Sequence, residues 1–173
     1  KWSVNVYIAE ENGNTYDGDL QLVPVGLPRG VRMIAPDYTS GMNGVPCLFV
    51  ADADAVPSAH LFHILLKRVD DGSFIDTSSQ AYIPFINHSG GRSWHHVHLQ
   101  RYALGIVESS PFTIDVIEPN IPISQAGELR CKVRINRNED FDGSVEMQPD
   151  WFPPGVSTGG RLEIPAGESE AEF

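Results

Sequence analysis

A stretch of residues near the start of the chain occurs a second time near its end. Residues 16–31, YDGDLQLVPVGLPRGV, align without a gap with residues 141–156, FDGSVEMQPDWFPPGV, so that the two copies are offset by 125 positions. Six aligned pairs are identical: Asp17/Asp142, Gly18/Gly143, Pro24/Pro149, Pro28/Pro153, Gly30/Gly155 and Val31/Val156. Because self-similarity at a fixed offset is typical of tandem copies of one structural unit, the sequence predicts two copies of one fold.

Both copies carry the same two turn motifs. An aromatic residue followed by Asp-Gly, at residues 16–18 and 141–143, is typical of a tight turn between antiparallel strands. Each copy then reaches a Pro-x-Gly-Val motif, at residues 28–31 and 153–156. Proline fixes φ and glycine adopts angles that other residues avoid, so this motif predicts a rigid corner between two sheets.

The whole chain contains short strand patterns separated by turn residues. No segment has the sustained 3.6-residue periodicity of an amphipathic helix, and 13 prolines and 16 glycines supply many turns. The predicted fold class is therefore all-β, with the strands packed as sandwiches. The strands are expected at residues 2–9, 19–25, 31–35, 45–51, 59–68, 97–107, 112–118, 129–137, 144–149, 161–165 and 169–173.

The strand pattern is interrupted at Glu108–Pro111, where a polar break precedes a new strand. We expect a first domain at residues 1–108, which lacks its opening strand and carries an insertion at about residues 70–93. The second domain is expected at residues 109–173, without its closing strands. The insertion is expected to form either a β-hairpin or a loop. Since the chain begins and ends within strand-like patterns, we expect it to be a fragment of a longer polypeptide.

Four motifs resemble one known family. The segment Pro111–Pro119 is similar to its PF-x-I-x-V-x-EP opening strand, Pro153–Val156 to its PPGV corner, Ile164–Ala171 to its IPAG-x-x-E-A turn, and Ala51–His60 to the turn before its sixth strand. In these motifs the chain resembles the bacterial Ig-like repeats of large exported proteins. The resemblance implies tandem Ig-like β-sandwich domains, the second incomplete, and an extracytoplasmic location in the periplasm, at the cell surface or outside the cell. It implies no catalytic activity.

The charge of the chain excludes two classes of partner. Twelve basic residues against 23 acidic ones give a formal net charge of −11, which repels nucleic-acid phosphates and anionic lipid. The longest apolar runs, such as Leu61–Leu66, are far shorter than the ~20 residues of a membrane span. We therefore expect no nucleic-acid partner and no membrane span in this segment.

Few residues have the pattern of a catalytic or cofactor site. The chain has no Gly-x-Ser-x-Gly motif and no glycine-rich phosphate loop between a strand and a helix. Its two cysteines, Cys47 and Cys131, fall in strand patterns of different repeats, so we expect two free thiols rather than a disulfide. The sequence predicts no enzyme, no catalytic residue and no cofactor.

Two metal-like patterns also favour a structural interpretation. His96 and His98 share one face of a strand, but no Cys, Asp or Glu lies within the run. The histidines alternate with Val97 and Leu99, which are interpreted as core residues. The alternating oxygen-bearing residues of 136–143 fail the EF-hand pattern, because its sixth and twelfth positions hold apolar side chains. We predict no metal site. At 136–143 the sequence favours an Asx-stabilised turn, and a calcium site of a type other than the EF-hand is the alternative.

These observations predict a non-catalytic structural or interaction module, acting as a spacer, adhesive surface or assembly subunit of a large exported bacterial protein. The expected partners are other protein chains or further domains of the same polypeptide. Two alternatives remain open: a module that binds carbohydrate or another surface polymer, and an accessory domain of an exported hydrolase. The candidate ligand or partner surface consists of residues in and next to the insertion: Tyr82, Phe85, Trp94, His96 and His98.

Overall fold

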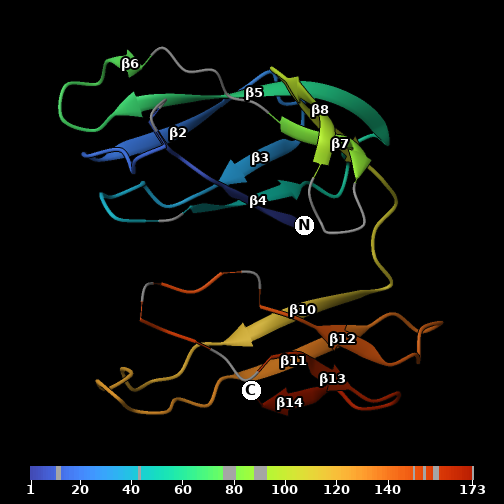
Figure 1. Ribbon diagram of the computed structural model, residues 1–173. Coiled ribbons are helices and arrows are strands. Elements are labelled where there is room, and N and C mark those ends of the chain that lie inside the picture. Colours follow the sequence, from blue (N-terminus) through green and yellow to red (C-terminus); the bar gives the residue numbers. More distant parts are fainter. Residues whose placement is uncertain are drawn as a thin grey trace. The chain divides into compact units, whose positions relative to one another are not determined.

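The computed structural model describes residues 1–173 except 11–12, 43, 76–80, 88–92, 150, 154, 158–159 and 173; at residues 81–87, 93–94, 96 and 98 it describes the backbone alone. Within the described chain every element is a strand (Figure 1). All the strand pairs that these residues form are antiparallel, which confirms the prediction of an all-β protein. No helix long and apolar enough to cross a membrane occurs among these residues.

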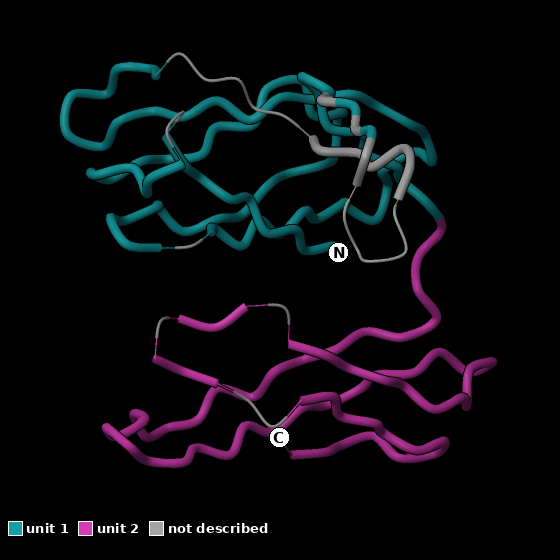
Figure 2. The backbone as a smooth tube through the Cα atoms, in the orientation of Figure 1, with its two compact units in different colours: residues 1–107 teal, residues 108–173 magenta. Residues whose placement is uncertain are grey.

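The chain separates into two compact units, unit 1 at residues 1–107 and unit 2 at residues 108–173 (Figure 2). The strands of unit 1 are β1 (Trp2–Val6), β2 (Leu20–Val25), β3 (Val31–Ile34), β4 (Val45–Ala51), β5 (Ser58–Arg68), β6 (Phe74–Ile75), β7 (Ala81–Asn87), β8 (Ser93–Leu99) and β9 (Tyr102–Ile106). The strands of unit 2 are β10 (Phe112–Ile117), β11 (Lys132–Arg137), β12 (Val145–Met147), β13 (Leu162–Ile164) and β14 (Glu170–Glu172).

Two sheets of unit 1 share one hydrophobic core. Strands β1, β4 and β3 form one sheet in that order, and β5 pairs with β2, β6 and β9 in the other. Alternate residues of β4, including Cys47 and Phe49, are buried, as expected of a strand with one face on a core. They meet Leu20 of β2 and Phe62 of β5 in one cluster. The rings of Phe49 and Phe62 lie edge to face, with their centroids 5.1 Å apart, and so connect the two sheets.

The insertion of unit 1 forms a β-hairpin, in which β7 pairs with β8. The prediction of one continuous strand at 97–107 is wrong in this region. The structure bends at Gln100–Arg101, and the two halves find different partners: β8 pairs with β7, whereas β9 pairs with β5. Strand pairing joins residues that are far apart in sequence, so a local pattern of alternation cannot reveal such a change of partner.

Unit 2 contains a smaller core between two smaller sheets. Strands β10, β11 and β14 form one sheet in that order, and β12 pairs with β13 in the other. The buried cluster takes Val133 and Ile135 from β11, Val145 from β12 and Ile164 from β13. The side chains of Val133 and Ile164 are fully buried. The period-2 pattern of each strand therefore directs its apolar residues to the space between the sheets.

The two units have the same corner. In each Pro-x-Gly-Val motif the valine N–H donates to the proline carbonyl three residues earlier, at 3.1 Å from Val31 to Pro28 and 3.1 Å from Val156 to Pro153. The glycines of the two motifs have positive φ angles of 79° and 84°. Pro28 and Pro153 thus occupy equivalent turns, as the repeat predicts, and glycine is required there because L side chains rarely adopt such angles.

A second equivalence follows the corner and is not visible as sequence identity. Leu20 of β2 pairs with Tyr38, and its counterpart Val145 of β12 pairs with Ile164. Tyr38 and Ile164 are both fully buried. Each is followed by a tight turn, in which the N–H of Met42 or Glu168 donates to the carbonyl three residues before it, at 3.1 and 3.2 Å. The two units therefore match well beyond the aligned segment, and β12 is the counterpart of β2.

Candidate interaction surface

The predicted ligand surface falls on the β7–β8 hairpin. The strand register places Tyr82 opposite His98, and Phe85 lies at a register shift of β7. Trp94 and His96 belong to β8. The side chains of these five residues lie outside the described part of the structure. The prediction that they form one surface therefore stays a prediction.

Two neighbouring side chains of β8 differ from the sequence interpretation. The alternation with the histidines predicts core positions for Val97 and Leu99, yet these side chains are 46% and 39% exposed. The interpretation is wrong because neither side chain is buried, and among the described strands β7 and β8 pair only with each other. The hairpin consequently presents apolar side chains to solvent.

Polar residues in both units take part in local hydrogen bonds. The Nε2 atom of His60 lies 3.0 Å from the hydroxyl of Ser58. At the start of the turn at 136–143, Asn136 donates from its side-chain amide to Asp115 at 2.7 Å, and the Phe141 N–H donates to the Asn138 carbonyl at 3.0 Å. In the described part of the chain no three His, Cys, Asp or Glu side chains are grouped as a metal ion requires. Both cysteines are free and lie in different units.

A shallow hollow lies between β5 and β9 of unit 1. Its lining is mainly apolar: Ala59, His60, Leu61, Ala103, Leu104 and Gly105. The imidazole of His60 is the one titratable group in this lining, and its described contact is the Ser58 hydroxyl. A nucleophile, a general base and an orienting group do not converge there, as acyl or phosphoryl transfer would require.

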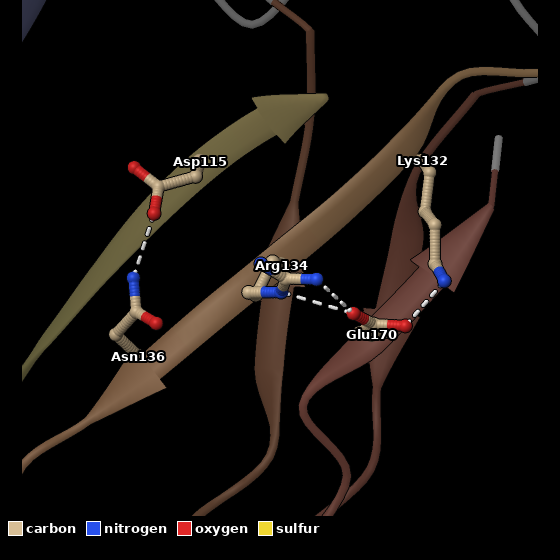
Figure 3. A network of polar contacts seen from close by, with 5 residues as sticks. All are labelled: Asp115, Lys132, Arg134, Asn136 and Glu170. Atoms are coloured by element: carbon tan, nitrogen blue, oxygen red, sulfur yellow. Dashed lines mark hydrogen bonds and ion pairs between the residues drawn. The ribbon is translucent and has the colours of Figure 1, made fainter. Parts of the chain in front are cut away.

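The outer face of the unit 2 sheet is polar. Asp115 of β10 accepts a hydrogen bond from Asn136 of β11 (Figure 3). Glu170 of β14 accepts two hydrogen bonds from the Arg134 guanidinium, at 2.9 and 2.8 Å, and forms an ion pair with Lys132. Hydrogen bonds from Lys132 and then Arg134 lower the pKa of the Glu170 carboxyl. These charges are exposed to water, so the outer face is a solvated surface that crosses three strands.

The inner face of the same sheet is apolar and incompletely covered. Ile114 and Val116 of β10 lie directly opposite Ile135 and Val133 of β11, and cross-strand partners share a face. The two β11 residues are buried in the core, whereas Ile114 is 37% and Val116 57% exposed. Their exposure means that the two-stranded β12–β13 sheet does not extend over β10. We call Ile114 and Val116 the apolar ledge of unit 2.

One edge of the β12–β13 sheet also lacks a strand. β12 pairs with β13 on one side, and among the described residues no strand pairs with its other side. Its counterpart in unit 1, β2, pairs with Tyr38 on the equivalent side and with β5 on the other. A free strand edge presents unpaired N–H and C=O groups to a partner strand.

Arg137 connects two turns of unit 2, and the sequence pattern did not indicate this role. Its guanidinium donates to the carbonyls of Gly143, Pro165 and Glu168, the latter two at 3.1 Å. It also lies over the ring of Phe141, 5.4 Å from the centroid. Nothing in the local pattern distinguishes this arginine from a solvated strand residue, because its partners lie up to 31 positions away.

Comparisons of the chain with protein-family models, with curated proteins and with solved structures found no match. The structure therefore defines the class of the protein: it is an all-β protein of several small antiparallel sheets. Its two units repeat one another in turns, pairing and buried positions.

Proposed function

We propose that the chain is a tandem of Ig-like β-sandwich units that serves as a non-catalytic structural or interaction module of a large exported bacterial protein. The observation that carries the proposal is the repetition of one unit, with the same proline–glycine corner in both copies. Tandem copies of one small β unit suit a spacer, an adhesive surface or an assembly subunit, because each copy adds length and surface.

The strand order supports the Ig-like part of the proposal. In an Ig sandwich of the constant type, strands B, E and D form one sheet with A, and strands C, F and G form the other. The sheet β1–β4–β3 of unit 1 has the order B–E–D, and β2–β5–β9 has the order C–F–G. Unit 2 would supply A, B and E as β10–β11–β14, and C as β12. The two units would thus be overlapping parts of one plan, in which both contain strands B, C and E.

The non-catalytic part is supported by how the polar groups are used. The carboxylates and amides of the outer face of unit 2 are paired with one another, and Arg137 is occupied by turn carbonyls. The hollow of unit 1 has apolar walls. Function has to be argued from a site, and the described groups form structural contacts rather than a reacting constellation.

The proposal is tested on the natural polypeptide. An antibody raised against residues 1–173 is used to find the native protein in cell fractions, and its intact mass is measured. We expect a polypeptide much larger than 19.0 kDa in an extracytoplasmic fraction. A cytoplasmic protein of 19.0 kDa would contradict the proposal. The full sequence of that polypeptide also decides whether a hydrolase domain accompanies the tandem.

The exposure of Val97 and Leu99 favours a second candidate, a module that binds carbohydrate or another surface polymer through the β7–β8 hairpin. A glycan array probed with the tandem tests this candidate, with Trp94→Ala as the variant and Trp2→Ala, in β1, as the matched control. Binding that only Trp94→Ala abolishes would support it. Absence of binding across the array would leave the structural module as the better proposal.

A further inference from the structure

We propose that the free edge of β12 and the apolar ledge of unit 2 bind one extended strand of the β5 type, supplied by the same polypeptide beyond β14. This inference rests on the tandem repeat of the proposed function and names what completes its second copy. The strand is antiparallel to β12, has large apolar residues at alternate positions, and carries a basic residue opposite Glu146.

Unit 1 shows what such a strand does. β5 lies antiparallel to β2, with Leu66 opposite Leu22 and Ile64 opposite Pro24. Phe62 and Ile64 of β5 are each only 3% exposed and belong to the core cluster. The strand therefore satisfies the backbone groups of the β2 edge and also fills the space between the sheets.

Unit 2 has the matching edge without the strand. β12 is the counterpart of β2, because Val145 and Leu20 make the equivalent pairs with Ile164 and Tyr38. In the described residues the buried cluster of unit 2 has four members, against nine in unit 1. Met147 is half-buried where its counterpart Leu22 is buried. The residues that β5 contributes to unit 1 have no equivalent among the described residues of unit 2.

The ledge shows where the additional apolar side chains go. Ile114 and Val116 face the core side of their sheet, yet solvent reaches them. The opposite face of β10 carries Asp115, which is hydrogen-bonded to Asn136 and needs no cover. β13 lies against β14, at the opposite end of the larger sheet from β10, so the free edge of β12 is on the β10 side. An occupant of that edge extends the small sheet toward β10 and removes apolar surface from water, at about 25 cal/mol per Å² buried.

Charge specifies one position of the occupant. In unit 1, Gln21 of β2 lies opposite Lys67 of β5. At the aligned position unit 2 has Glu146, whose carboxylate already accepts a hydrogen bond from Arg161 at 2.6 Å and lies beside Glu163 of β13. A basic residue opposite Glu146 adds an oppositely charged cross-strand pair to a locally acidic edge.

The order of the strands in the repeat indicates that the occupant comes from the same polypeptide. β5 follows β4 after residues 52–57, and β4 pairs with β1 as β14 pairs with β11. The strand that follows β14 in the order of the repeat is therefore the counterpart of β5. A second copy of this chain has its own β5 already paired with β2, β6 and β9, so that strand is not free to pair with the β12 edge.

The first experiment adds the strand as a peptide. The probe is a synthetic peptide of residues 57–69, and the readout is amide hydrogen exchange of the full 173-residue chain. In unit 1 the N–H and the C=O of Leu20 are both hydrogen-bonded to Tyr38. Val145 is the counterpart of Leu20, so its N–H points toward β13. The N–H of the next residue, Glu146, then points toward the free edge. We expect exchange at Glu146 to slow by about tenfold or more with the peptide.

Two controls separate strand addition from nonspecific binding. A peptide in which Phe62 and Ile64 are both replaced by Asp keeps its backbone but loses its inward apolar face, and it should have no effect. In the protein, Ile114→Asn alters the ledge, whereas Thr113→Asn alters the outer face of the same strand. Only Ile114→Asn should weaken the peptide effect. Equal effects of both peptides, or no slowing at Glu146 by either, would overturn the proposal.

The second experiment tests the source of the strand. The chain is extended after Phe173 by a second copy of its own residues 48–107, in the register that the pairing of β14 with β11 sets. We expect a monomer in which exchange at Glu146 slows as it does with the peptide. A dimer with that protection in the unextended chain would instead identify a second copy as the occupant. If either the peptide experiment or the extension experiment fails, the proposed function is still tested separately by the location and mass of the natural polypeptide.

Discussion

At the scale of single residues, the two thiols have different surroundings. Cys47 of β4 is fully buried in the core of unit 1, and burial raises the pKa of its thiol to about 11 from an ordinary value of 9.0. Cys131 is only partly buried. The reacting species is the thiolate, so both burial and the raised pKa protect Cys47.

We therefore predict that iodoacetamide at pH 8 modifies Cys131 in the folded chain and leaves Cys47 intact. Peptide mass mapping gives the site, and denaturant should make the two thiols equally reactive. The folded state holds the Cys47 proton more tightly than the unfolded state does, so the protonated thiol favours folding. This contribution to the free energy of unfolding is complete below the unfolded pKa near 9 and is lost as pH rises toward 11. Rapid alkylation of Cys47 in the native protein would contradict its buried position.

Glu170 supports a second prediction at this scale. Its carboxyl pKa is lowered by Lys132 and Arg134, so its contribution to stability is present above the unfolded pKa of about 4.5 and is lost as pH falls through the lower folded value. Glu170→Gln should lower the thermal midpoint of unit 2 slightly at pH 7 and low salt. The difference from the native chain should decrease as pH falls below 4.5, and it should also shrink in 1 M salt, where screening is strong. A loss that is independent of pH would show a packing effect instead.

At the scale of elements, the local features were predictable and the pairings were not. The corners follow from proline and glycine chemistry within four residues, so the sequence predicted them. The break between β8 and β9 depends on a change of partner, and the likeness of Tyr38 and Ile164 rests on equal burial of unlike residues. The exposure of the ledge was not predictable either, because the alternation of apolar residues in β10 is that of a core strand whether or not a second sheet covers it.

The corners supply the prediction that belongs to this scale. Gly30 and Gly155 both have positive φ, so an alanine at either position is strained and should destabilise its own unit by roughly 1 kcal/mol or more. An alanine Cβ at position 155 would touch nothing within 4 Å, so its cost is conformational alone; at position 30 it would also lie 3.4 Å from the Ala55 Cβ. Denaturant unfolding of the Gly30→Ala and Gly155→Ala chains measures both effects. Gly105→Ala, with open space and ordinary backbone angles, is the matched control.

At the scale of the whole molecule, the two units have the same plan but different completeness. The buried cluster of unit 1 takes residues from both sheets, because β5 contributes Phe62 and Ile64 from the sheet that contains β2. In unit 2 the ledge remains open and β12 is paired on one side only among the described strands. A small domain has only ~5–15 kcal/mol of stability, so a missing strand is a large fraction of the total.

We therefore predict that the 173-residue chain unfolds in two steps, with unit 2 first. In native-state hydrogen exchange, amides of β2, β4 and β5 should open only with global unfolding of unit 1, while those of β11 and β12 should exchange at lower free energy. The reason is that backbone hydrogen bonds in unit 2 are backed by four buried apolar residues and by edges that water reaches. Adding the peptide of residues 57–69 should raise the protection of unit 2 and leave unit 1 unchanged, since the β2 edge is already occupied. Strong protection throughout residues 129–173 in the peptide-free monomer would show that unit 2 is stable without a further strand, and would refute this order of unfolding.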